Sequence, residues 1–388
     1  MKNLLSFSIC VLLSFFGLKA QTINPTYSNV DYTGMGNSKQ MLDIYIPSGV
    51  TSPTATIVHI HGGAFLSGSK GTSQQSSYQN LYNNGYICVD INYRLSSDSI
   101  WPAQIFDCKA AIRYLKANAE KYHIDTNKIG VIGESAGGYL VAMLGTTAEE
   151  PSLEGLHLGN TNVTSRVHAV VDLFGPINFL TMDSEATALG FSLSTNSATS
   201  PESKLMGAAV QTIPELVKKA NPTTYISADD ASFFISAGSA DKNIPYTQGQ
   251  NFNQALAAII GNDRTSFELL AGAGHGGTVW FTNEQNAKYL AFFQKALTGL
   301  TNIEENFYSA INPEISIAPN PVIETLSINI PGNNSFEIMV YNWLGQIVYT
   351  QSNVTAPVDI SCKNIPNGLY FVKAISAGKV LSINFTKQ

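Results

Sequence analysis

The chain has 388 residues, of which 44% are hydrophobic and only 13% are charged. This length predicts two or three domains, and the large apolar fraction excludes wholesale disorder. The 22 lysine and arginine residues against 28 acidic residues give a net charge of −6. A general nucleic-acid-binding protein needs a basic surplus to neutralise phosphates, so this charge argues against that class.

The first 20 residues have the pattern of a secretory signal peptide. Lys2 supplies the positive start, residues 4–18 are apolar apart from small residues, and Ala20 suits the cleavage position. The apolar run is shorter than the roughly 20 residues that span a bilayer, and no later segment reaches that length. We therefore expect a protein that is secreted or held at the cell surface, with no transmembrane segment in its mature form.

Cleavage after residue 20 would leave three cysteines, Cys88, Cys108 and Cys362. An odd number cannot supply a disulfide framework, so packing must stabilise the fold. One bridge, Cys88–Cys108, remains an open alternative to two buried free thiols, because small buried cysteines are common in protein cores.

Strand-like and helix-like runs alternate between residues 21 and 300, which we take as the first domain. Apolar runs typical of buried parallel strands fall at residues 54–60, 86–92, 129–132, 167–173, 232–237 and 266–270. Helical periods fall at residues 103–121, 248–260 and 283–297. This alternation predicts an α/β fold with a mostly parallel sheet and helices on both faces, in which chemistry gathers at the carboxyl ends of the strands.

The pattern changes after residue 300. Residues 301–315 have no clear period and are expected to form a linker. From residue 316 to residue 388, period-2 runs alternate with glycine, asparagine and proline turns, which predicts a small C-terminal β-sandwich.

The strongest local motif runs from Gly133 to Gly138 and contains Ser135. It follows the apolar run at 129–132 and precedes a helix-prone apolar run. A strand, a Gly-x-Ser-x-Gly turn and a helix form a nucleophile elbow, which raises the serine hydroxyl above the sheet. The alternative is an ordinary glycine-rich turn with no catalytic role.

A second motif, His61-Gly62-Gly63-Ala64-Phe65, follows the strand at 54–60. Acyl transfer passes through an oxyanion that needs backbone N–H donors, and glycine lets a backbone approach a substrate closely. We expect the amides of Gly63, Ala64 and Ala136 to form this oxyanion hole. One alternative is that the glycines serve only to let the chain turn. Another is that His59 and His61 bind a metal ion as a pair. The metal pair lacks further ligands at suitable spacing.

A serine nucleophile needs a base, and His275 is the best candidate among the histidines. It lies late in the chain, on a glycine-rich loop after the strand at 266–270. In enzymes with this elbow the acid falls between the serine and the histidine, at a strand end. Asp241, just after the strand at 232–237, fits this place, and its rivals are Asp172, Asp229 and Asp230.

Residues 175–225 are expected to form a cap that shapes the pocket. Phe65, Phe174 and Phe179 are candidate wall residues, although each is equally plausible as a core side chain.

These motifs together resemble the α/β-hydrolase fold esterases of the feruloyl and acetyl-xylan esterase type, close to the hormone-sensitive-lipase-like group. The resemblance is carried by residues 41–47, 61–65, 90–95, 101–102, 107, 133–138, 200–203, 207, 241 and 274–276. It implies hydrolysis of carboxylic esters without a metal or an organic cofactor, on acetyl or feruloyl esters of plant polysaccharide. Ala64 departs from the family, where a third glycine is frequent, and this weakens any expectation of bulky tertiary-alcohol substrates.

The tail resembles the C-terminal sorting domain of the type IX secretion system of Bacteroidetes. Its matching stretches are residues 319–322, 326–328, 340–348, 359–361 and 366–372. The resemblance implies that the type IX machinery is a partner and that the tail is cleaved after export. A carbohydrate-binding β-sandwich is the rival interpretation.

The residues therefore predict a secreted serine esterase with Ser135, His275 and Asp241 as its catalytic triad. Alternatives on the same fold are a short-chain lipase-like esterase, an arylformamidase or a peptidase. An alternative from another class is a catalytically inactive surface-binding module, against which the complete set of three residues argues.

Overall fold

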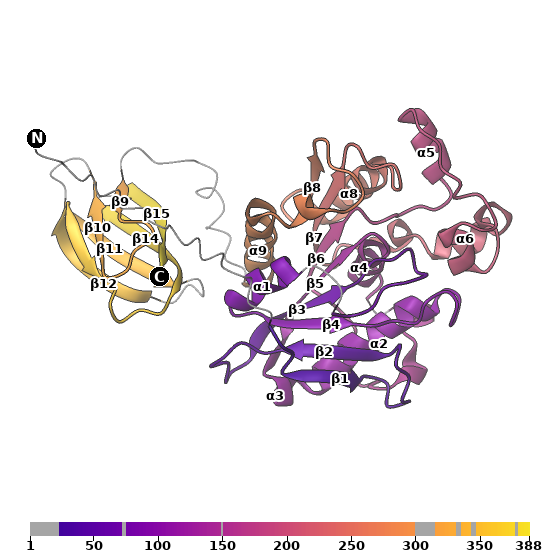
Figure 1. Ribbon diagram of the computed structural model, residues 1–388, viewed down its shortest axis with the longest axis horizontal. Coiled ribbons are helices and arrows are strands. Elements are labelled where there is room, and N and C mark those ends of the chain that lie inside the picture. The colour runs from indigo at the N-terminus through magenta and orange to yellow at the C-terminus, as the bar shows by residue number, and fades with distance from the viewer. Residues whose placement is uncertain are drawn as a thin grey trace, which may run out of the picture.

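The computed structural model describes residues 23–71, 75–148, 150–298, 315–330, 335–342, 347–376 and 379–388. The expected signal peptide and residues 301–314 of the expected linker lie outside these ranges. A larger α/β unit and a smaller, yellow β unit are visible in Figure 1 and are described separately.

The α/β unit is built on one large sheet. Within the described residues this sheet has eight strands in the order β1-β2-β4-β3-β5-β6-β7-β8. β1 and β2 pair antiparallel, as do β2 and β4, and the pairs from β4 through β8 are parallel. The bounds are β1 Tyr27–Asp31, β2 Met41–Tyr45, β3 Thr54–Ile60, β4 Ile87–Ile91, β5 Ile124–Glu134, β6 Ala169–Leu173, β7 Ser232–Gly238 and β8 Thr265–Leu270.

Helices cover both faces of this sheet, because successive side chains of each strand point to opposite sides. In β3, Ile57 packs into one core and its neighbours Val58 and Ile60 pack into the other. One face is covered by α1 (Gln75–Asn83) and α9 (Asn283–Thr298), and the other by α2 (Ala103–Ala117), α4 (Ala136–Thr146) and α8 (Thr247–Ile260) (Figure 1). The predicted α/β fold class is thereby confirmed.

Two local features differ from the sequence expectation. The helix expected at 103–121 ends at Ala117, and a short α3 (Ala119–Tyr122) follows. The break lies at Asn118, whose side-chain Nδ2 donates to the carbonyl of Tyr114 and competes with continued helix. The edge strand β1 and its neighbour β2 were not among the expected strands.

The segment between β6 and β7 consists of short helices and turns. It contains α5 (Met182–Ala188), α6 (Pro201–Met206), η3 (Val210–Thr212), α7 (Pro214–Lys219) and η4 (Pro222–Tyr225). Gln248 of α8 holds the start of this segment. Its side-chain oxygen accepts from the amides of Ile177 and Asn178, and its Nε2 donates to Glu185. Further short 3₁₀ turns are η1 (Pro151–Leu153), η2 (Leu156–Leu158) and η5 (Thr278–Phe281).

The β unit consists of two antiparallel sheets that enclose their own hydrophobic core. Among the described residues the sheet orders are β13-β10-β9 and β12-β11-β14-β15. This confirms the expected β-sandwich. The bounds are β9 Ser316–Ala318, β10 Thr325–Asn329, β11 Ser335–Asn342, β12 Ile347–Thr355, β13 Val358–Ser361, β14 Gly368–Ser376 and β15 Lys379–Lys387.

Cys88 and Cys108 do not form a bridge. Both side chains are buried as thiols outside any disulfide, and burial raises the pKa of each. The reason is the pleat of the sheet, since Cys88 on β4 and Cys108 on α2 pack into the cores on opposite faces.

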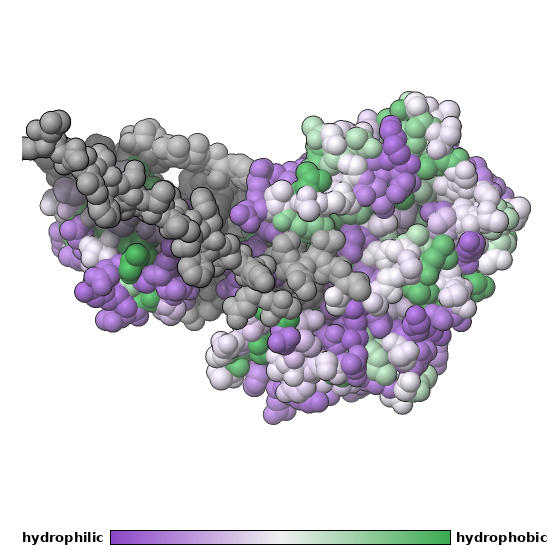
Figure 2. Space-filling view, in the orientation of Figure 1, coloured by the Kyte–Doolittle hydropathy of each residue, from purple (hydrophilic) through white to green (hydrophobic). Residues whose placement is uncertain are grey.

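The surface of the α/β unit is mixed. Figure 2 shows hydrophilic and hydrophobic residues interspersed over the described part of this face. Of the helices in the described ranges, none combines the length and the hydrophobicity that crossing a bilayer would require.

Candidate active site

Ser135 lies in the tight turn between β5 and α4. Its φ is 55°, in the sparsely populated left-handed half of backbone space, and its amide donates to the carbonyl of Leu173 at 2.9 Å. The turn is possible only because of a glycine two residues on, since a Cβ at Gly137 would lie 1.9 Å from the carbonyl oxygen of Ile60. The sequence thus places a serine hydroxyl at the carboxyl end of a central strand.

His275 lies between Ser135 and Asp241. Its Nε2 is 2.9 Å from the Ser135 Oγ, and its Nδ1 is 2.7 Å from the Asp241 Oδ2. Asp241 is 3% exposed, and its other oxygen accepts from the amides of Asn243 and Ile244. A carboxylate held by two amides accepts from Nδ1–H, which leaves Nε2 to accept the serine proton.

Two aromatic side chains support the His275 loop from behind. The ring of Phe174 stands edge-on to the His275 ring at 4.9 Å and packs on Trp280 at 4.5 Å between centroids. Trp280 is fully buried, and its indole N–H donates to the carbonyl of Gly274 at 3.2 Å. The imidazole is therefore held by packing as well as by its hydrogen bonds.

The loop after β3, which was expected to supply an oxyanion hole, has an unusual backbone. Gly63, Ala64 and Phe65 all have positive φ, at 110°, 55° and 62°. Within the described residues, the amides of Gly63 and Ala64 donate to no hydrogen-bond acceptor. The amide of Ala136, at the first position of α4, has no intrahelical acceptor, as at any helix start.

A buried ionic cluster lies beneath this loop. His59 Nδ1 is 2.9 Å from Asp90 and its Nε2 is 2.8 Å from Glu134, while the amide of Gly62 donates to the other oxygen of Glu134 at 3.2 Å. Burial lowers the pKa of His59, but the carboxylates of Glu134 and Asp90 outweigh burial and raise it to about 10. His59, on the strand that leads into this loop, is thus held to Glu134 beside Ser135 and to Asp90 on β4.

The three other candidates for the catalytic acid contact groups other than His275. Asp172 is fully buried, accepts from the amide of Gly175, and burial raises its pKa to about 7. Asp229 pairs with Arg166, and Asp230 accepts from the hydroxyl and amide of Ser227. Of the four candidate acids, Asp241 is the one that the structure brings to His275.

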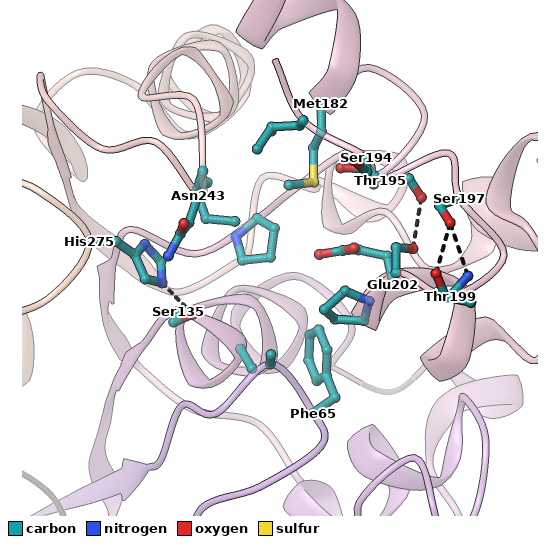
Figure 3. A pocket seen from close by; sticks show the side chains of 17 residues that line it. Phe65, Ser135, Met182, Ser194, Thr195, Ser197, Thr199, Glu202, Asn243 and His275 are labelled. Atoms are coloured by element: carbon teal, nitrogen blue, oxygen red, sulfur yellow. Dashed lines mark hydrogen bonds between the residues drawn. The ribbon is translucent and has the colours of Figure 1, made fainter. Parts of the chain in front are cut away.

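A cavity of about 510 Å³ opens at Ser135 and His275 (Figure 3). Phe65 lines it, together with Ala64 and Ala136. Phe174 and Phe179 do not, since Phe174 backs His275 and Phe179 packs behind Phe65 at 6.4 Å. The remaining lining comes mainly from the segment after β6: Pro176, Met182, Leu193, Ser194, Thr195, Ser197, Thr199, Ser200, Pro201 and Glu202, with Asn243 and Ile244.

The sequence alone assigned no role to Glu202 or Trp280, and it offered His59 only as half of a metal pair. Ser200, Pro201 and Glu202 belong to a stretch that carried the family resemblance, which was the one available signal for Glu202. Among the residues that the structure describes, no cluster of three or more histidine, cysteine or acidic side chains has the arrangement of a metal site.

Two family models match this chain. A model named BD-FAE matches residues 42–256, more than half of the chain, and a model described as a secretion system C-terminal sorting domain matches residues 316–387. The first match includes Ser135 and Asp241 and ends before His275.

Individual proteins are similar over the α/β unit. Esterase LipC of Mycobacterium tuberculosis is 30% identical over 238 residues, which are 61% of this chain and 57% of LipC, and the probable carboxylic ester hydrolase LipM of the same organism is 29% identical over 211 residues. The chain spans about half the length of these relatives, 57% and 46%.

Two solved structures share the fold with a TM-score of 0.64. A bifunctional GH43-CE protein of Bacteroides eggerthii is 33% identical, over 70% of this chain and 35% of its own. A truncated carbohydrate esterase from gut microbiota is 31% identical, over 70% of this chain and 96% of its own.

Proposed function

The chain belongs to the BD-FAE family, and from that premise we propose that it is a secreted serine esterase that removes acetyl or feruloyl groups from plant polysaccharide. The observation that carries the proposal is the hydrogen-bonded series of Ser135, His275 and Asp241 at the floor of an open cavity.

The first half of the reaction forms an acyl-enzyme. Ser135 Oγ attacks the ester carbonyl carbon while His275 Nε2 takes the hydroxyl proton, and Asp241 stabilises the resulting imidazolium. The carbonyl oxygen becomes an oxyanion and accepts hydrogen bonds from the amides of Gly63, Ala64 and Ala136. Each such donor is worth roughly 3 kcal/mol to the transition state.

The second half releases the acid. His275 gives its proton to the departing alkoxide, so that the carbon–oxygen bond to the alcohol breaks. Water then enters, loses a proton to the same nitrogen, and attacks the acyl carbon. Ser135 leaves with that proton, and the free acid departs.

The names of the relatives support the substrate class. LipC is described as an esterase, and the two solved structures are described as carrying a carbohydrate esterase. The C-terminal unit is a type IX sorting domain, which points to an extracellular or cell-surface location, where polysaccharide is available.

A substrate panel tests the proposal. Purified protein should release acetate from 4-nitrophenyl acetate and from acetylated xylan, or ferulate from feruloylated xylan oligosaccharides, and Ser135→Ala should lower each rate by at least 10³-fold without changing the thermal midpoint of unfolding. Preference for longer acyl esters, for formyl anilides or for peptides would favour another hydrolase. No turnover of any ester would favour an inactive binding module.

A further inference from the structure

The end of the cavity across from Ser135 is polar. Its lining comes from one stretch, residues 194–202, and carries the hydroxyls of Ser194, Thr195, Ser197, Thr199 and Ser200 with the carboxylate of Glu202. Figure 3 shows the Glu202 side chain pointing into the cavity, with Ser135 and His275 on the other side.

Glu202 is buried without a compensating charge. It is 7% exposed, and within the described residues no cationic side chain forms an ion pair with it. Burial raises the pKa of Glu202, and the nearby charge that acts on it is another anion, Asp183, which raises it further. An unpaired buried carboxylate is costly, and that cost is relieved when a ligand supplies hydrogen-bond donors.

The polar end is already held in shape. The two carboxylate oxygens of Asp183 accept from the amides of Thr195 and Asn196, at 2.8 and 3.1 Å. The Ser200 hydroxyl donates to the carbonyl of Thr195 at 2.8 Å and accepts from the amide of Ser203 at 3.0 Å. Because the loop is fixed before a ligand arrives, little ordering cost opposes binding.

We propose that Glu202 is a specificity-determining residue that accepts hydrogen bonds from hydroxyls of a sugar that forms the alcohol part of the ester. The two oxygens of a carboxylate can accept from two neighbouring hydroxyls at once. An acetyl group carries no donor, so the donors must come from the alcohol. The surrounding serine and threonine hydroxyls suit a neutral polyhydroxylated ligand better than a cation.

The cavity has a suitable size for this ligand. Its volume of about 510 Å³ lies within the range of about 300–1,000 Å³ that is usual for small-molecule sites. The inference rests on the proposed esterase function, because the sugar is recognised in the same cavity as the reacting carbonyl.

The test compares two acetate esters that share the acyl group and differ in the alcohol. We would measure kcat/KM for a monoacetylated methyl β-xyloside and for 4-nitrophenyl acetate, in the full chain and in Glu202→Gln, Glu202→Asp and the control Glu215→Gln. The Glu215 carboxylate lies on α7, is 80% exposed and pairs with Lys218 on the surface. Thermal unfolding of each variant checks that it is folded.

The ratio of kcat/KM for the sugar ester to that for 4-nitrophenyl acetate should fall at least fivefold in Glu202→Gln, mainly through KM. Glu202→Asp should recover part of the loss, and Glu215→Gln should leave the ratio unchanged. A fall of less than fivefold in Glu202→Gln overturns the inference while the esterase function stands. A preference of the wild type for acetylcholine that is lost in Glu202→Gln also overturns it, in favour of a cationic alcohol. If the wild type hydrolyses neither acetate ester nor feruloylated xylan oligosaccharides, the esterase proposal fails and the inference falls with it.

Discussion

Replacing His59 tests how the turn at Ser135 and the loop after β3 are held together. In His59→Gln the side chain keeps an amide donor and loses its positive charge, so the buried Asp90 carboxylate and the partly buried Glu134 carboxylate lose the cation that lies between them. Removing one partner of a buried charge cluster costs about 3–5 kcal/mol. The rise of the His59 pKa from 6.5 to about 10 agrees, because each pKa unit corresponds to roughly 1.4 kcal/mol.

The pH dependence of this effect has a definite sign. The folded-state pKa of His59 lies above its unfolded value, so its contribution to stability is complete below about pH 6.5 and is lost as the pH rises toward 10. Thermal unfolding of wild type and His59→Gln should therefore differ by on the order of 10 °C at pH 6. The difference should shrink steadily between pH 7 and pH 10.

The control is His157→Asn, because His157 is exposed and its ring contacts Phe106, not a carboxylate of this cluster. It should shift the midpoint little at any pH. The reasoning would be refuted if His59→Gln unfolded at the wild-type temperature at pH 6, or if the two proteins differed equally at pH 6 and pH 10.

The remaining predictions concern the acid and the elbow. Asp241→Asn should lower kcat by about 10⁴-fold, since His275 would be held in the wrong tautomer, whereas the buried Asp172→Asn should stay within tenfold of wild type in steady-state kinetics. The opposite order would reassign the acid to Asp172. Gly137→Ala should destabilise the fold by more than about 3 kcal/mol in urea unfolding, because its Cβ meets the Ile60 carbonyl at 1.9 Å. Gly34→Ala is the control, because a Cβ there meets open space and only the positive φ opposes it, so the free energy of unfolding should fall by about 1 kcal/mol. Equal losses of stability at Gly137 and Gly34 would show that the turn at Ser135 can relax around the added Cβ.

The catalytic candidates could be named from the sequence because each follows from a local pattern. Ser135 lies in a turn with a recognisable strand before it and a helix after it, and Asp241 and His275 each follow a strand. The carboxyl ends of parallel strands meet at one edge of the sheet, so position along the chain was enough to predict that these residues meet.

The ionic cluster could not be found in the same way. His59 lies in the expected strand, as the last residue but one of β3, but its partners Asp90 and Glu134 lie 31 and 75 residues further on. Their meeting depends on strand order and register, since β3 pairs with both β4 and β5 and His59 stands opposite Asp90. Neither order nor register can be read from hydrophobic periods alone.

The residues that line the cavity could not be predicted from the sequence either. Phe65, Phe174 and Phe179 are equally apolar, and nothing in their local sequence distinguishes a cavity wall from the layer behind it. The structure separates them, with Phe65 at the cavity and the other two behind it. Cys88 and Cys108 posed a similar question, which depended on the face of the sheet that each residue occupies.

The most direct test of a nucleophilic Ser135 is covalent trapping. The protein would be treated with a fluorophosphonate at pH 7, digested, and mapped by mass spectrometry. We predict a single adduct on Ser135, no adduct in Ser135→Ala, and labelling at least 10²-fold slower in His275→Ala. An adduct on a different residue, or labelling of Ser135→Ala at the wild-type rate, would contradict the account.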